Sequence, residues 1–162
     1  MAHFAGFIVI GILTFVCCLR VTHSFPDGAP VDVCVKPRAN QPYHGQARSQ
    51  PIGTSPYTFV ASSSEYQPNS QITVKISGSP FKGFFIQARD SNTNAWIGSW
   101  AQTPNTNTHP ECSGVTHADA HNKQEASLIW NAPPNVAGPV YFTGTILKEY
   151  VMFWSDLVAT SG

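Results

Sequence analysis

The sequence has little charge and no excess of either sign. Its 162 residues hold nine Lys and Arg against nine Asp and Glu, and charged residues make up only 11% of the chain. Binding to nucleic acid needs clustered Lys and Arg that displace counterions from phosphates, and adhesion to anionic membranes needs a polybasic stretch. The sequence has neither, so we expect no nucleic-acid partner.

Motifs of known catalytic chemistry are also missing. No Gly-X-Ser-X-Gly turn is present to expose a nucleophilic serine. None of the few acids lies in an aromatic-rich motif that would suggest a sugar-cleaving pair. No Asn-X-Ser/Thr acceptor for N-glycosylation occurs either. We therefore predict no catalytic residue and no cofactor, and we expect that the protein is not an enzyme.

A single long apolar run lies at the N-terminus, from Phe4 to Leu19, and small and polar residues follow it up to Ser24. This layout is typical of a secretory signal. The run is shorter than the roughly 20 apolar residues that span a bilayer, so stable membrane insertion is not expected. The sequence predicts a removable signal peptide over residues 1–24, one domain over residues 25–162, and a secreted, extracellular protein.

Cysteine is scarce, and whether the cysteines form a disulfide depends on whether the protein is exported. Cys17 and Cys18 fall inside the predicted signal, which leaves Cys34 and Cys112 in the mature chain. An even pair in an oxidising compartment indicates a disulfide, and it leaves no free thiol as a nucleophile. A bridge across about 79 residues would stabilise the fold by about 4 to 5 kcal/mol.

Short runs rich in β-branched and aromatic residues recur along the chain, and clusters of Gly, Pro, Asn and Ser separate them. No window shows a helical apolar stripe. Many short strands with frequent turns favour an all-β antiparallel sandwich or barrel. The sequence predicts a polar surface loop over residues 103–110 and about eight strands, at Val31 to Val35, Tyr57 to Ala61, Gln71 to Ser77, Gly83 to Arg89, Trp96 to Ala101, Ala126 to Asn131, Val140 to Leu147 and Val151 to Val158.

Two tryptophans are candidates for ligand binding. Trp130 sits inside a strand run beside apolar neighbours, so it is predicted to pack in the core together with Phe142 and Phe153. Trp96 and Trp100 instead flank polar loops, and at a spacing of four they would share one face of a strand. If that face is exposed, their rings could stack on sugars or lipid. Core packing is the alternative.

Histidines and acids cluster after the second mature cysteine. His117 and His121 are four residues apart, with Asp119 between them. This spacing suits a metal ion only on a helix, and the residues before His117 are typical of a strand or turn. We expect solvated loop histidines and no metal site, with a site at His117 and His121 as the alternative.

Taken together, an ordered set of blocks resembles the reeler (reelin-type) domain. The blocks are Phe25-Pro-Asp-Gly-Ala-Pro30, Cys34, Pro42-Tyr-His-Gly45, Tyr57, Tyr66-Gln-Pro68, Phe81-Lys-Gly-Phe-Phe-Ile-Gln-Ala-Arg89, Cys112, Thr116-His117, Ile129-Trp-Asn-Ala-Pro133 and Phe153-Trp154. They cover essentially the whole mature chain. The resemblance implies an immunoglobulin-like sandwich, and it suggests that Cys34 and Cys112 form the family's bridge.

Function is implied by the resemblance alone, because a fold does not fix a function. Reeler domains occur in neuronal matrix proteins, in membrane-bound ferric-chelate reductase-like proteins and in small secreted proteins. A lone domain resembles the third group, the arthropod defence proteins of the noduler type. The implied activity is innate immunity: binding microbial surface polysaccharide or lipopolysaccharide, promoting haemocyte nodulation and limiting bacterial growth.

Two other functions stay open from the sequence. A secreted structural or matrix protein of eggshell or cuticle would suit the same sandwich and aromatics. A metal- or redox-linked accessory is suggested by the histidines and by the reductase relatives. Near-neutral charge argues against a membrane-lytic peptide, so recognition or agglutination is expected before lysis.

Overall fold

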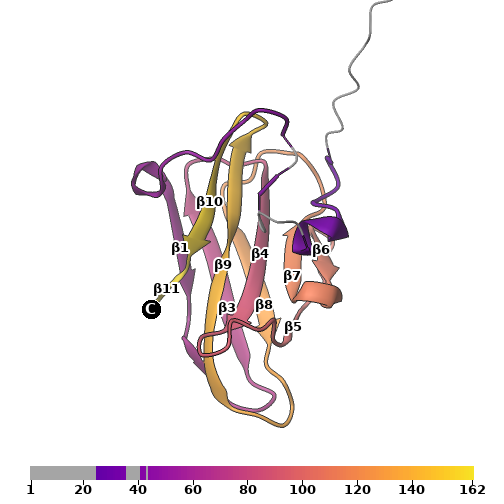
Figure 1. The fold of residues 1–162 in the computed structure, drawn as a ribbon, viewed down its shortest axis with the longest axis vertical. Coiled ribbons are helices and arrows are strands. Elements are labelled where there is room, and N and C mark those ends of the chain that lie inside the picture. Colours follow the sequence, from indigo (N-terminus) through magenta and orange to yellow (C-terminus); the bar gives the residue numbers. More distant parts are fainter. Residues whose placement is uncertain (1–24, 36–40, 43) are drawn as a thin grey trace, which may run out of the picture.

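The computed structural model describes residues 25–35, 41–42 and 44–162; the predicted signal peptide lies outside them. The described chain forms strands and three short 3₁₀ helices (Figure 1). In chain order the elements are η1 (Val31–Cys34), η2 (Ile52–Thr54), β1 (Tyr57–Ala61), β2 (Glu65–Tyr66), β3 (Gln71–Gly78), β4 (Gly83–Asp90), β5 (Ser99–Trp100), β6 (Thr106–His109), η3 (Pro110–Cys112), β7 (Gly114–His117), β8 (Ala126–Asn131), β9 (Gly138–Glu149), β10 (Met152–Val158) and β11 (Thr160–Ser161).

Two sheets form the predicted all-β sandwich. The first has the order β11-β1-β3-β8-β5, and the second has the order β10-β9-β4-β7-β6 with β2 paired to β9. Neighbouring strands are antiparallel except β1 and β11, which run parallel. This arrangement confirms the antiparallel β-sandwich predicted from the short strands and frequent turns.

The core between the sheets follows the alternation of the sequence. In β3, Ile72, Val74 and Ile76 are buried while their neighbours are not. This alternation is expected of a strand with one face in the core and the other toward solvent. Trp130 of β8 is fully buried, and the ring of Phe142 meets it edge-on at 5.7 Å. The core positions predicted for Trp130, Phe142 and Phe153 are confirmed.

Strand β4 is buried on both faces. Phe84, Ile86 and Ala88 belong to the core between the sheets. Phe85, on the opposite face, packs in a second cluster with Val33, Cys34, Cys112 and Ala29. Residues 25–35, which we call the N-terminal segment, therefore cover the outer face of the second sheet (Figure 1).

Two sequence predictions were wrong, and both concern this covering. Residues 31–35 contain the 3₁₀ helix η1 instead of a strand, because Pro30 starts a turn in which its carbonyl accepts the amide of Val33. Residues 103–110 are not a plain loop, since Thr106–His109 form β6 and pair with β7. Strand β6 is polar because its side chains hydrogen-bond to the N-terminal segment instead of entering an apolar core.

Strand lengths also differ from prediction. The run from Trp96 to Ala101 yields only the two-residue strand β5, whereas β8 spans the predicted Ala126–Asn131. The short strands β2 and β11 had no periodic signal, because two residues cannot show an alternation.

Within the described residues, no helix has the length and apolar character needed to cross a membrane.

Gly144 lets β9 approach β4 closely. A Cβ atom at this position would lie 2.0 Å from the carbonyl oxygen of Phe85 and 2.8 Å from Cδ1 of Ile86. We expect Gly144→Ala to lower the free energy of unfolding by about 2 kcal/mol or more, because the core must shift to admit a methyl group. Urea unfolding followed by tryptophan fluorescence measures this loss.

Gly53→Ala is the matched control, because a Cβ atom there meets nothing within 4 Å. We expect it to change the free energy of unfolding by less than about 1 kcal/mol. Equal losses in both variants would contradict the close packing of β9 on β4.

Candidate functional site

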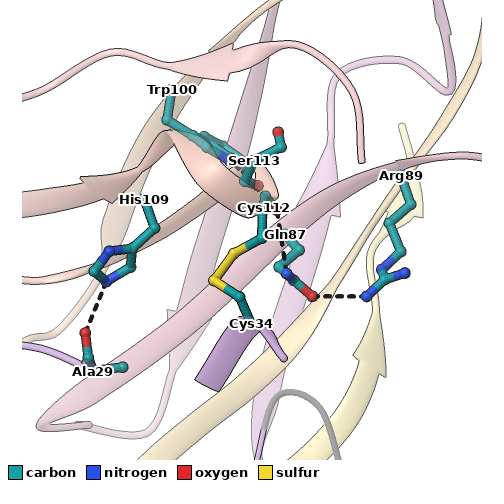
Figure 2. Close-up of a disulfide and its surroundings, with 8 residues drawn as sticks. All are labelled: Ala29, Cys34, Gln87, Arg89, Trp100, His109, Cys112 and Ser113. Carbon is teal, nitrogen blue, oxygen red and sulfur yellow. Dashed lines mark hydrogen bonds between the residues drawn. A yellow bond between two sulfur atoms is a disulfide. The ribbon is translucent and has the colours of Figure 1, made fainter. Parts of the chain in front are cut away.

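The predicted disulfide joins η1 to η3. Cys34 and Cys112 are bonded, with their Cα atoms 5.8 Å apart (Figure 2). Both cysteines are buried against Phe85 of β4. The bond therefore fixes the N-terminal segment to the outer face of the second sheet.

Three hydrogen bonds fix the same segment nearer to its N-terminal end, at Asp27 and Ala29. The amide of Ala29 donates to Oγ1 of Thr116 at 3.0 Å, and Nε2 of His109 lies 2.7 Å from the carbonyl oxygen of Ala29. Nδ2 of Asn107 donates to the carbonyl oxygen of Asp27 at 2.7 Å. Polar side chains of β6 and β7 thus hold a segment that has no strand of its own.

Gln87 connects the disulfide to the sheet surface. Its side chain is fully buried, and its Nε2 donates to the carbonyl oxygen of Cys112 at 3.2 Å. Its Oε1 accepts from Nη2 of Arg89 at 3.1 Å. Figure 2 shows this line of contacts, which runs from the disulfide through Gln87 to Arg89. Because a buried amide needs both partners, Gln87 fixes where the guanidinium lies.

Arg89 orients an exposed indole. Its guanidinium carbon lies 5.7 Å from the centre of the Trp96 ring, and its Nη1 donates to the carbonyl oxygen of Asn94 at 3.0 Å. The hydroxyl of Tyr141 donates to Oδ1 of Asn94. Trp96 is 40% exposed. We call these four residues, Arg89, Asn94, Trp96 and Tyr141, the Trp96 surface.

Hydrogen bonds to Asp90 close the turn that leads to Trp96. Oδ1 of Asp90 accepts the backbone amides of Asn92 and Thr93, each at 2.8 Å. The amide of Thr93, and then that of Asn92, holds the pKa of the Asp90 carboxyl below its ordinary value, because both bonds favour the charged form. Asn94 follows in a left-handed conformation with φ of 60°, which Asn tolerates better than most residues.

Trp100 is not part of this surface, which corrects the expectation of two exposed tryptophans. It is buried, and its Nε1 donates to the carbonyl oxygen of Ser113 at 2.8 Å. Gly98 separates the two rings with φ of +64°, and a Cβ atom there would lie 2.3 Å from the Trp130 ring. Because the chain turns at Gly98, Trp96 and Trp100 do not share a strand face.

The two histidines of the alternative metal site lie in different environments. The expectation of a solvated loop histidine was wrong for His117, which is buried on β7, where its Nδ1 accepts the amide of Phe84 at 3.2 Å. His121 is exposed, and its Nδ1 lies 3.2 Å from Oδ1 of Asp119. Among residues 25–35, 41–42 and 44–162, no group of three His, Cys, Asp or Glu side chains could hold a metal ion.

The Trp96 surface offers stacking and hydrogen bonding. It combines one exposed aromatic ring with the donors and acceptors of a guanidinium, an amide and a phenol. Arg89 and Tyr141 were not singled out in the sequence, because they face each other across the β4–β9 pair. Pairing of distant strands leaves no local signal, and the exposed Trp96 was the one residue that pointed here.

Comparison with known proteins identifies similar chains. The family model of the Reeler domain matches residues 34–161. "Putative defense protein 3" of Antheraea mylitta is 34% identical over 151 residues, which cover 88% of this chain and 88% of the moth protein. Other moth relatives also carry defence-protein names.

Reductases and a solved structure share the same region. "Ferric-chelate reductase 1" of Homo sapiens is 28% identical over 85% of this chain, and the match spans 24% of the human protein. This chain therefore corresponds to about a quarter of that enzyme's length. The crystal structure of the human F-spondin reeler domain has a TM-score of 0.55 at 18% identity and covers 75% of this chain and 96% of that one. This likeness concerns the fold.

His117 predicts a pH dependence of stability. Burial is the main reason that the pKa of its ring lies below the ordinary value of 6.5. The unfolded chain therefore takes up a proton near pH 6.5, while the folded protein does so only at lower pH. We expect the free energy of unfolding to fall as the pH falls below about 6.5, as urea unfolding between pH 7.5 and 5 would show.

His117→Gln should flatten this dependence, since it removes the titrating ring. His121→Gln is the control, because His121 is exposed, and it should leave the slope unchanged. A His117→Gln slope equal to that of the unsubstituted protein would contradict the assignment.

Proposed function

The chain belongs to the Reeler domain family, and from this membership we propose that it is a secreted innate-immune protein that binds polysaccharide of microbial surfaces through the Trp96 surface. The observation that carries the proposal is the similarity to "Putative defense protein 3" over 88% of both chains. The match covers most of the moth protein as well as most of this chain. The reductase relatives share only a part of their length with it.

The chemistry of the Trp96 surface favours sugars over other microbial components. A pyranose ring offers a C–H face that packs on an aromatic ring, and its hydroxyls pair with planar polar groups. Trp96 offers the ring, while Arg89, Asn94 and Tyr141 offer polar atoms beside it. The guanidinium is already bonded to Gln87 and Asn94, so it is oriented before a ligand arrives.

Low charge supports recognition of a neutral polysaccharide over capture of a phosphate-rich one. The whole chain has no net charge, and Arg89 is the one cation of the Trp96 surface. Binding that depends on stacking is weakly sensitive to salt, because few counterions are released. Promotion of haemocyte nodulation and of antibacterial defence would follow from coating the microbial surface.

The test is retention of purified protein on insoluble β-1,3-glucan, peptidoglycan and whole bacteria. We expect retention on at least one of these, little changed between 50 and 500 mM salt. Trp96→Ala should weaken it about tenfold or more, because an aromatic stacking partner contributes about 1 kcal/mol beyond its buried area. Absence of retention on every surface would overturn the proposal.

Tyr150→Ala is the matched control. Tyr150 is 36% exposed, close to the 40% of Trp96, but it lies in the turn between β9 and β10, away from the Trp96 surface. We expect it to bind glycan like the unsubstituted protein. Equal losses in both variants would mean that Trp96 has no specific part in binding.

A further inference from the structure

A cavity of about 240 Å³ lies between the N-terminal segment and the second sheet. Phe25 and Val33 line it from the segment, Phe85 from β4, and Leu147 from the end of β9. The ring of Tyr150 also lines it and is partly exposed, so it stands at the opening. The cavity is larger than the roughly 150 Å³ apolar cavity that binds benzene in another protein.

The N-terminal segment forms the roof of the cavity and is held above the second sheet. The disulfide fixes it at Cys34, and the hydrogen bonds of Asp27 and of both backbone groups of Ala29 fix it earlier in the segment. Most of the lining surface is apolar, and the cavity is open to solvent. An apolar group that enters it is therefore removed from water, which is favourable.

Two opposite charges line the same cavity. Lys82 and Glu149 are both exposed, and both contribute to its lining. They lie at one end of the β4–β9 ladder, where the amide of Lys82 donates to the carbonyl oxygen of Leu147 at 2.9 Å. Among the described residues, neither side chain has a salt bridge. The opening therefore carries two side chains of opposite charge, Lys82 and Glu149.

We propose that the cavity binds a single-chain zwitterionic lipid. The hydrocarbon chain lies between Phe25, Phe85 and Leu147. The phosphate of the headgroup faces Lys82 and its ammonium group faces Glu149, so the lipid neutralises both charges at the opening. This site lies at the opposite end of β4 from the Trp96 surface, and the proposal does not depend on glycan binding.

The probe is decylphosphocholine below its micellar concentration, titrated by calorimetry into protein purified from the medium of expressing cells. We expect saturable binding of one molecule, about three- to fourfold tighter for each methylene added from eight to ten carbons. Decyl sulfate and decyltrimethylammonium carry the same chain with one charge each. Both should bind more weakly than the zwitterion.

Charge reversals test the headgroup contacts. Lys82→Glu leaves two carboxylates at the opening and should shift the preference to decyltrimethylammonium, whereas Glu149→Lys should shift it to decyl sulfate. Lys75→Glu is the control, because Lys75 is exposed on β3 of the other sheet, and it should change no preference. Equal binding of all three heads to every variant would overturn the headgroup assignment.

Two further variants test the location. Ala29→Leu adds bulk under the roof and Ala120→Trp adds bulk at the opening, since both residues line the cavity. Each should weaken decylphosphocholine binding tenfold or more. Ala137→Trp places the same bulk on an exposed loop outside the lining, and it should bind normally.

Unfolding temperatures of all variants show whether they are folded. Trp96→Ala should bind decylphosphocholine normally, so loss of glycan binding and loss of lipid binding are separable. Absence of saturable binding to the unsubstituted protein, or unchanged binding in both folded cavity variants, would overturn the proposal.

Discussion

The structure depends on one constraint: the outer face of the second sheet carries buried side chains, both the apolar Phe85 and the polar Gln87 and Thr116, and must be covered. Strand β4 is buried on both faces, which a sandwich of two sheets alone cannot achieve for its outer surface. The N-terminal segment provides the cover although it has no strand to pair with the sheet. A disulfide and side-chain hydrogen bonds from β6 and β7 take the place of a β-ladder. Formation of the Cys34–Cys112 disulfide is therefore part of folding, and such bonds persist in oxidising compartments.

Both proposed sites are consequences of this covering. The cavity exists because the segment is held above Phe85 and Leu147 without filling the space between them. The Trp96 surface exists because the carbonyl of Cys112 holds Gln87, which in turn holds Arg89 beneath the indole. The two sites lie at opposite ends of β4, so one strand connects the polar and aromatic Trp96 surface to a largely apolar cavity. A single small domain thereby carries two sites of different chemistry.

The sequence predicted what local pattern encodes. Alternation in β3 and the apolar run of β8 placed the core strands correctly, and the pair of mature cysteines predicted the bridge. It could not predict the covering, because Val31, Val33 and Val35 alternate like a strand yet fold as a 3₁₀ turn after Pro30. Of the four residues of the Trp96 surface, the sequence indicated only Trp96. The burial of Trp100 depends on a carbonyl oxygen thirteen residues away, which no local pattern reveals.

Amide hydrogen exchange followed by mass spectrometry tests the central claim most directly, comparing the oxidised protein with a Cys34→Ser, Cys112→Ser double variant. The account predicts that the variant stays folded and that exchange becomes faster in residues 25–35 and 106–112 and at Arg89. The amide of Ala29, which donates to Thr116, should lose protection, while β3 and β8 keep theirs. Unchanged protection of the N-terminal segment in a folded double variant would contradict the account.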